Sequence, residues 1–239
     1  MKLSGLCVKS ISLRGGFSYN PRMSDSIAIR PFQGADRSGV RRIACDTADA
    51  GEPMENFFSD RELLADLLTR YYTDFDSRST FVAVEGAAVA GYLTGCLDTR
   101  RFHRRMALKI FPLALAKAVA RGVLFRGDTW RLIQAGLATW WKGTSHRQRH
   151  FDRYPAHLHI NIAKAYRGQK IGHRLIEKFL DQAKAAGVPG IHLATRGDNT
   201  SGRAFFERVG FQLMDTEPAF FPSSTGLIKQ DVCVYARSL

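Results

Sequence analysis

Apolar residues recur along this chain with two spacings that change from segment to segment. Period two, typical of a half-buried strand, is clear in residues 26–32 (SIAIRPF), and the three-to-four spacing of a helix with one buried face follows in residues 36–47. The same patterns predict strands at 80–85, 89–97, 157–163, 191–195 and 230–237, and helices at 60–72, 172–186 and 201–209. A chain that mixes strands and helices in this order is expected to form an α/β domain.

Turn and capping residues mark several ends of these elements. Ser59 and Glu62 form an S-x-x-E pattern, which predicts a capping box at the start of the helix at 60–72. The turn at 86–88 joins two strands as an antiparallel hairpin, and Gly210 ends the last helix. The prolines and serines of residues 218–225 predict a loop.

Residues 100–153 interrupt this order and are expected to be a helical insertion. They contain two basic amphipathic stretches, 106–125 and 129–141, which are separated at Arg126 and Gly127. The apolar runs are too short to cross a bilayer, because they are interrupted by Lys109, Pro112, Lys117 and Arg121.

The charge of the chain is concentrated in this insertion. The 239 residues carry a formal net charge of +13, and +11 of it lies between 100 and 153, where thirteen Lys and Arg face only Asp128 and Asp152. This favours an anionic partner, which is an acidic substrate, a phosphate-rich cofactor, nucleic acid or a membrane surface, unless the charges are only solvated helix faces. If the helices form a lid on the domain, the packing residues are Trp130, Trp140 and Trp141.

The remaining composition is that of a globular protein. With 45% hydrophobic and 24% charged residues, the chain lacks the polar bias of disorder. The four cysteines lie far apart, so we expect no metal, no disulfide framework and a reducing cytoplasm. Residues 1–22 lack the features of a secretory signal and are expected to be an extension of a domain at 23–239, because Met23 opens the first strand.

The most regular part of the chain is the strand, turn and helix from His157 to Ala186. Residues 167–172 (RGQKIG) lead from the strand into the helix. The first N–H groups of a helix have no intrahelical acceptor and lie at its positive dipole end, so this turn predicts a site for a diphosphate. Neither G-x-G-x-x-G nor the P-loop pattern occurs, which weakens a nucleotide-binding interpretation.

Two motifs resemble those of the GNAT acetyltransferases. The family's central motif reads [QR]-x-x-G-x-[GA], and here Arg167 and Gly172 match its ends while Lys170 occupies its middle glycine. A later family helix often reads N-x-x-A-x-x-[LF]-Y-x-x-x-G-F, which residues 199–211 (NTSGRAFFERVGF) match with Gly202 in place of alanine and Phe206 in place of tyrosine.

A closer resemblance lies in three further segments: 91–101 (GYLTGCLDTRR), 154–162 (YPAHLHINI) and 187–199 (GVPGIHLATRGDN). They are similar to bacterial GNAT proteins related to the acetyltransferase-like module of O-GlcNAcase enzymes.

The resemblance implies a GNAT-type mixed, mostly antiparallel central sheet flanked by helices, with a splayed parallel strand pair at 160–163 and 191–195. Acetyl-CoA would place its pantetheine arm in the gap, bonded to the main chain, and its pyrophosphate on the turn. The residues implied to bind it are Ile160, Ile162, Arg167, Gly168, Gln169, Lys170, Ile171, Gly172, Asn199 and Phe206.

Transfer of an acetyl group to an amine requires removal of the amine proton. Strand alternation places His157, His159 and Asn161 on one face, and His159 is the candidate base because histidine titrates near neutral pH. Asn161 is the second catalytic candidate, at a position where relatives often carry a carboxylate. Phe206 has no proton to donate to the thiolate. The acid is therefore water or one of three tyrosines, Tyr92, Tyr154 and Tyr166, unless the thiolate leaves without an acid.

We therefore expect an N-acetyltransferase that transfers an acetyl group from acetyl-CoA to a primary amine through a ternary complex. The expected acceptor is a small molecule or a peptide, and an acidic acceptor is one of the possibilities. A homodimer is also left open. One alternative is a catalytically weak acyl-CoA-binding or sensor module. The other is a protein that binds nucleic acid or a membrane surface through the basic insertion.

Overall fold

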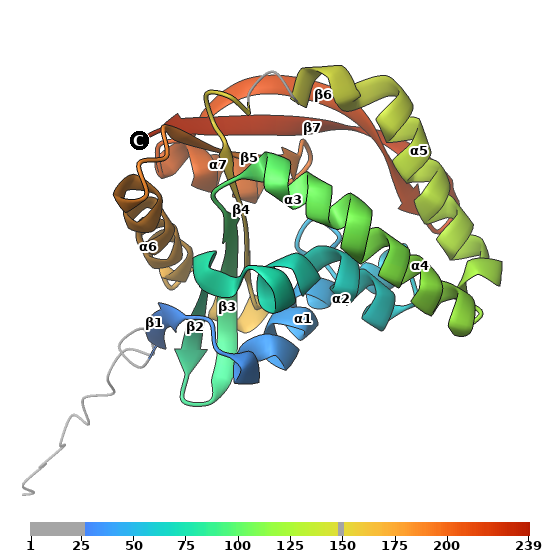
Figure 1. The fold of residues 1–239 in the computed structure, drawn as a ribbon, viewed down its shortest axis with the longest axis horizontal. Helices are drawn as coiled ribbons and strands as arrows, with labels where there is room; N and C mark the ends of the chain where they lie inside the picture. Colours follow the sequence, from blue (N-terminus) through green and yellow to red (C-terminus); the bar gives the residue numbers. More distant parts are fainter. Residues whose placement is uncertain (1–26, 148–150) are drawn as a thin grey trace, which may run out of the picture.

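The computed structural model describes residues 27–147 and 151–239, which contain one seven-stranded sheet (Figure 1). The strands are β1 (Ile27–Pro31), β2 (Thr80–Glu85), β3 (Ala88–Cys96), β4 (Ala156–Ile162), β5 (Gly190–Arg196), β6 (Gln212–Ser223) and β7 (Gly226–Ser238). Their order is β1-β2-β3-β4-β5-β7-β6, and every neighbouring pair is antiparallel except β4 with β5. The expected mixed, mostly antiparallel sheet is confirmed. The expected extension at 1–22 lies outside the described residues.

Helices cover both faces of this sheet. They are α1 (Arg37–Asp46), α2 (Arg61–Arg70), α3 (Thr99–Arg105), α4 (Phe111–Ala120), α5 (Gly127–Arg147), α6 (Ile171–Ala185) and α7 (Thr200–Arg208). On one face, Phe179 of α6 and Phe206 of α7 share a core with Leu158 of β4. On the other face, Val40 and Ile43 of α1 pack against β2 and β3. Because successive strand residues point to opposite faces, the sheet supplies both cores.

The basic segment is helical, as expected, but its layout differs from the prediction. It begins with α3, which the sequence patterns missed, and α3 continues through a π-helical turn (Met106–Ile110) into α4. The chain reverses at Gly122, whose φ of 65° is left-handed, and α5 then runs along β6 (Figure 1). The predicted break at Arg126 and Gly127 coincides with the start of α5, but the chain already reverses at Gly122, because glycine adopts a left-handed φ without strain.

The predicted loop at 218–225 is wrong, because β6 continues to Ser223 and pairs with β7 throughout. Pro218 and Pro222 fit this strand since β6 is at the edge of the sheet, where a missing N–H breaks no ladder. Thr139 of α5 also holds the strand: its hydroxyl donates to Phe220 O at 3.3 Å and accepts from Phe220 N–H at 2.9 Å.

The predicted capping box is also wrong. The N-cap of α2 is Asp60, whose carboxylate accepts from Leu63 N–H at 2.9 Å. Ser59 instead donates its hydroxyl to Asp128 at 2.6 Å, a contact with α5 that local sequence cannot reveal.

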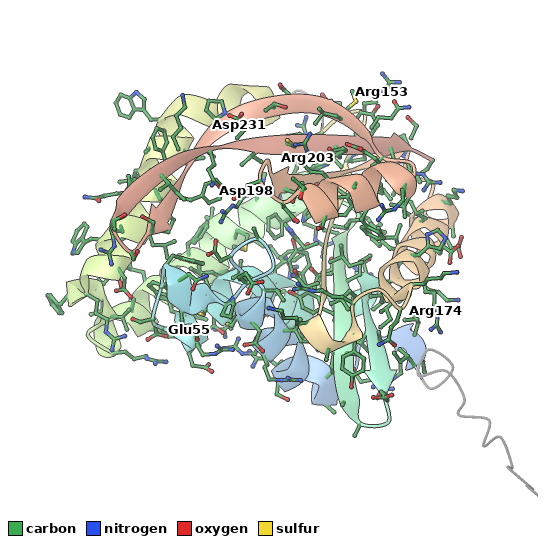
Figure 2. The ribbon with its side chains drawn as sticks, turned by 180° about the vertical axis from the view of Figure 1, so that it is seen from behind. Glu55, Arg153, Arg174, Asp198, Arg203 and Asp231 are labelled. Atoms are coloured by element: carbon green, nitrogen blue, oxygen red, sulfur yellow. The ribbon has the colours of Figure 1, made fainter. Side chains whose placement is uncertain are left out.

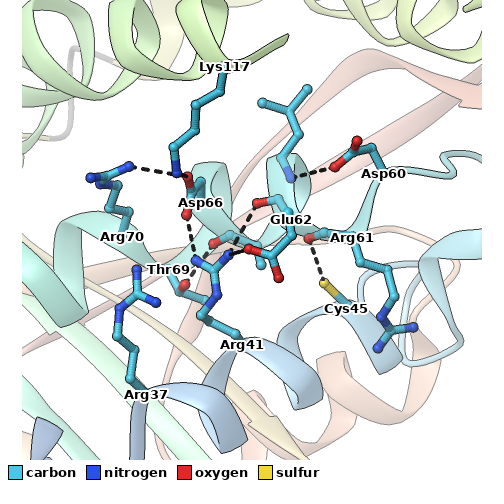
Figure 3. Close-up of polar contacts among 12 residues, drawn as sticks. Arg37, Arg41, Cys45, Asp60, Arg61, Glu62, Asp66, Thr69, Arg70 and Lys117 are labelled. Atoms are coloured by element: carbon cyan, nitrogen blue, oxygen red, sulfur yellow. Dashed lines mark hydrogen bonds and ion pairs between the residues drawn. The ribbon is translucent and has the colours of Figure 1, made fainter. Parts of the chain in front are cut away.

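A buried carboxylate joins the insertion to the domain. Asp66 of α2 has a 2% exposed side chain, and it accepts hydrogen bonds from Arg41 of α1 at 2.6 Å, from Arg70 at 3.2 Å and from Lys117 of α4 (Figure 3). Burial alone would raise the pKa of Asp66, but the hydrogen bonds from Lys117 and Arg41 lower it below its usual value. One carboxylate thus binds cations from three helices.

We predict that Asp66→Asn lowers the free energy of unfolding by about 3 kcal/mol, because it leaves the buried guanidinium of Arg41 with a weaker partner. Urea unfolding followed by circular dichroism measures this. Asp152→Asn is the matched control, since its ion pair with Arg100 joins side chains that are 82% and 69% exposed. It is expected to cost less than about 1 kcal/mol. Equal losses in the two variants would contradict the role given to Asp66.

Candidate functional site

The two parallel strands separate after two residue pairs. β4 and β5 pair only at Ala156 with Ile191 and at His157 with His192. β4 nevertheless stays paired with β3 as far as Ile162, and β5 stays paired with β7 over its whole length. The strands therefore diverge toward their C-terminal ends.

This divergence leaves main-chain groups of β4 without a strand partner. Ala163 N–H donates to Ala90 O at 2.9 Å, and Thr94 of β3 donates its hydroxyl to His159 O at 3.5 Å. Alternate residues of an antiparallel strand point to opposite edges, so the peptide groups of Ile160 and Ile162 point away from β3. They form a strand edge at which an extended ligand with amide groups can bind.

The turn after β4 has the backbone shape of an anion site. Gly168 has a φ of 80° and Lys170 a φ of 59°, both left-handed. The first backbone hydrogen bond of α6 runs from Arg174 N–H to Lys170 O at 3.3 Å. The amides of the preceding residues therefore stand at the positive end of the helix without an intrahelical acceptor. Within the described residues, Gln169 Oε1 is also buried without a hydrogen-bond partner.

Gly172 brings the two predicted motifs together. A Cβ at this position would lie 3.0 Å from Cζ of Phe205 and 3.7 Å from Ile160 of β4. The ring of Phe205, from α7, therefore packs on the start of α6 because residue 172 has no side chain.

Asn199 and Phe206 are engaged within the protein. Asn199 caps α7 by accepting from Gly202 N–H at 3.0 Å, and its amide donates to Thr195 of β5 at 3.0 Å. Phe206 is buried beside Phe211 and Tyr235. Both residues position α7 against the sheet, whereas Ile160, Ile162 and residues 167–172 lie around the divergence.

The turn that leads from β5 into α7 is braced by main-chain contacts. Gly197 N–H donates to Asp231 O of β7 at 2.7 Å, and Arg203 donates to Gly197 O at 3.2 Å. Figure 2 shows Asp198, Arg203 and Asp231 gathered at this end of β5. The position of Asn199, directly after the turn, is fixed by these contacts.

A segment between α1 and α2 contacts the ends of both diverging strands. Arg167 donates to Gly51 O at 2.7 Å and to Ile162 O at 3.3 Å. Asp49 pairs with Arg196, the last residue of β5. Sequence reasoning missed this segment, because a short link between helices carries no motif and its partners are more than 100 residues away.

On the opposite face of β4, His157 is fixed between two hydroxyl groups. Its Nε2 lies 2.7 Å from Tyr72 OH, and its Nδ1 lies 2.7 Å from Thr99 Oγ1. The side chain is buried, and burial lowers its pKa well below the ordinary histidine value. His157 is therefore a neutral structural residue at neutral pH.

His159 lies on the same face with its ring open to solvent on one side. Among the described residues its ring nitrogens have no hydrogen-bond partner, and the ring contacts Tyr72 and His157 with centroids 5.9 and 5.8 Å away. The protein that encloses its other sides lowers the pKa to about 4, with a smaller contribution from His192. The ring is neutral at pH 7 and free to accept a proton.

Asn161 and one candidate tyrosine form a pair. Asn161 donates its amide to Tyr92 OH at 2.8 Å, and burial raises the pKa of Tyr92. Tyr154 is buried beside Gly190, and Tyr166 donates to Glu85 at 2.9 Å. Of the three tyrosines, Tyr92 is thus the one in contact with a predicted catalytic residue.

A cavity of about 640 Å³ lies elsewhere, between α1 and α2. Three of the arginines that line it are paired with acids: Arg37 with Asp74, Arg41 with Asp66, and Arg61 with Asp46 and Glu55. The cavity is therefore close to electrically balanced, and none of the predicted site residues lines it.

Residues 27–147 and 151–239 contain neither a cluster of metal ligands nor a membrane-spanning helix. No group of three or more His, Cys, Asp or Glu side chains is placed to hold a metal ion there. In the same residues, no helix has the length and apolar character needed to cross a bilayer.

The matched family and the fold agree. Residues 135–211 match the model of the Acetyltransferase (GNAT) family. Over these residues the chain is similar to the GNAT acetyltransferases. In structure it is similar to SsHAT, with a TM-score of 0.66, 25% identity, and coverage of 89% of this chain and 98% of that one.

Other similarities are more distant or shorter. The fold of yncA from Salmonella typhimurium, solved with its cofactor acetyl-CoA, gives a TM-score of 0.53 at 13% identity, covering 90% of this chain and 94% of that one. An uncharacterized protein of Mycobacterium leprae is 37% identical over 71 residues, which are 30% of this chain and 19% of that protein. N-alpha-acetyltransferase 30 of Schizosaccharomyces pombe is 44% identical over 52 residues, which are 22% of this chain and 35% of that protein. The matches thus span a fifth to about a third of these relatives' length.

We predict that Lys170→Gly raises the free energy of unfolding by about 1 kcal/mol, because a left-handed φ strains any residue with a Cβ. Urea unfolding measures the change. Lys178→Gly is the matched control in the middle of α6, where glycine is expected to cost about 1 kcal/mol. A loss of stability in both variants would show that the backbone at Lys170 is not strained.

We predict that His157 makes the protein less stable in acid. As the pH falls below about 6.5, the unfolded chain binds a proton at this residue that the folded protein does not. Stability is therefore complete above that pH and decreases below it. Unfolding free energies at pH 8 and pH 5 should differ less in His157→Gln than in the parent. The same difference in both proteins would refute the prediction.

Proposed function

We propose that this protein is an N-acetyltransferase that binds acetyl-CoA across the diverging ends of β4 and β5 and transfers the acetyl group to a primary amine. One observation carries the proposal: the unpaired edge of β4 leads directly into the anion-type turn at 167–172. A pantetheine arm is extended and carries amides, so it suits a strand edge, while a pyrophosphate suits free N–H groups at a helix N-terminus. The two requirements are met by consecutive segments.

The side chains around the turn support this assignment. Lys170 is exposed at the start of α6, and Arg167 reaches from the same turn to Ile162 O. Both cations are within the segment that would hold the phosphates, where charge-assisted hydrogen bonds are strong. Asn199 and Phe206 would act by placing α7, which closes the other side of the gap through Phe205.

Acetyl-CoA supplies the acetyl group as a thioester. The neutral amine forms a C–N bond to the acetyl carbon, the C–S bond breaks, and the amine loses one proton. His159 is neutral at pH 7 and would take that proton directly or through water, and the main-chain N–H at Ile162 would stabilise the negative oxygen. Since a thiol has a pKa of about 8.5, the thiolate can leave without an acid.

An amine acceptor is supported by the activity named for the S. pombe relative, which is an N-alpha-acetyltransferase. The closer resemblance to bacterial relatives of the O-GlcNAcase module stays a prediction. A catalytically weak acyl-CoA-binding module is the second candidate, and it is favoured by the low basicity of His159 and by the buried Phe206.

The test combines calorimetry with a thiol-release assay. The parent should bind acetyl-CoA saturably and release thiol with at least one member of a panel of primary amines. His159→Ala should lower kcat about a hundredfold while acetyl-CoA affinity stays unchanged. His173→Ala, an exposed histidine of α6, is the control and should match the parent.

Three outcomes are informative. Failure to bind acetyl-CoA would overturn the proposal as a whole. Binding without thiol release from any amine would favour the weak acyl-CoA-binding module. Full activity in His159→Ala would remove His159 as the base and leave the cofactor assignment standing.

A further inference from the structure

Helix α4 is apolar on nearly every side yet packs on the domain along one stripe. The buried residues are Met106, Ile110, Ala114 and Ala118, which are four positions apart. The neighbouring stripe is exposed at Leu108 (66%), Phe111 (53%), Leu115 (56%) and Val119 (56%). A helix that is apolar all round is normally buried. We therefore expect the exposed side of α4 to be covered by a partner.

Large apolar side chains are also exposed past the chain reversal, in the turn before α5 and in α5 itself. Four large side chains are exposed there: Phe125 (89%), Trp130 (54%), Leu137 (60%) and Trp141 (83%). In α5 the last three are seven and four residues apart, so they lie along one side of the helix. Figure 1 shows α4 and α5 meeting at one end of the molecule, away from β1 and α6.

Basic residues lie beside these apolar side chains. Arg104 and Lys109 are exposed before α4, and Arg126 is exposed after it. Between Arg100 and Arg147 the sequence contains one acidic residue, Asp128, and this carboxylate is bonded to Ser59. The surface thus combines apolar groups with positive charge and offers no free carboxylate.

We propose that α4 and the adjoining part of α5 dock on the surface of an anionic lipid bilayer. Acyl chains would cover Leu108, Leu115 and Val119, anionic headgroups would meet the arginines and lysines, and Trp130 suits the boundary between the two. Docking is in the plane of the membrane, with the charged ends of the basic side chains extended to the headgroups.

Two other occupants fit the surface less well. A second copy related by a two-fold axis would place the same positive patch against itself. Nucleic acid would meet the basic residues but leave the aliphatic stripe of α4 uncovered, because its phosphate backbone is recognised by charge. Of these three occupants, the anionic bilayer is the one that matches both the apolar and the charged part.

Cosedimentation with phosphatidylcholine vesicles, with and without phosphatidylglycerol, tests the proposal. The parent should bind the phosphatidylglycerol vesicles, with a blue shift of tryptophan emission and weaker binding at high salt. Leu115→Gln with Val119→Gln should weaken binding about tenfold or more. Lys109→Gln should weaken it about fivefold. Leu213→Gln with Met214→Gln, which changes exposed residues of β6 (47% and 39%), is the matched control and should bind like the parent.

Circular dichroism and acetyl-CoA titration of each variant establish that the fold and the cofactor site are unchanged, so the result is independent of the proposed acetyltransferase activity. The proposal is wrong if the parent does not bind phosphatidylglycerol vesicles, or if the α4 variant binds as well as the parent. It is also wrong if light scattering shows a dimer that the α4 variant alone converts to monomer, or if duplex DNA or RNA binds more tightly than the vesicles.

Discussion

The unequal pairing of β4 determines the rest of the candidate site. β3 holds β4 along its length, whereas β5 holds it over only two residue pairs. A strand that lost both neighbours would not keep its shape, and one that kept both would have no free peptide groups. With one side fixed, the peptide groups of Ile160 and Ile162 keep a defined direction while having no partner strand. The turn at 167–172 and α6 follow from the end of the same strand, so their position is fixed by the β3 pairing as well.

Local patterns predicted the parts of this arrangement that depend on neighbouring residues. The strand, turn and helix from 157 to 186 were predicted from their clear periodicity. In the structure, Gly168 of this turn has a left-handed φ. Long-range contacts explain the predictions of secondary structure that were wrong. The loop predicted at 218–225 is a strand because β7 and α5 hold it, and Asp60 replaces Ser59 as the N-cap while Ser59 bonds Asp128. The lowered pKa of His159 likewise depends on the elements around it, which no motif encodes.

The insertion has two surfaces that differ in the interactions they make: one is charged and one is apolar. Toward the domain, Lys117 and Arg121 of the α4 region pair with Asp66 and Asp60, both nearly inaccessible to solvent. Separating these pairs would leave the buried carboxylates of Asp66 and Asp60 with fewer partners, whereas the half-exposed Lys117 and Arg121 would keep contact with solvent. Toward solvent, the same helices present apolar side chains that carry no directional constraint. The ion pairs thus fix the orientation of the insertion on the domain. Its solvent-facing apolar side can contact partners in more than one geometry.

The hydrogen bonds of His157 have a mechanical consequence. Thr99 is the first residue of α3, and its hydroxyl bonds both His157 Nδ1 and Pro155 O, while Tyr72 from the π-helical turn after α2 bonds the other ring nitrogen. His157 is two residues from His159 and one of the two β4 residues paired with β5. The start of the insertion and the point where the strands diverge therefore share a side chain. A displacement of α3 would therefore act on a side chain beside the divergence, and if it changed acetyl-CoA binding there, acetyl-CoA would act on α3 with the same coupling free energy.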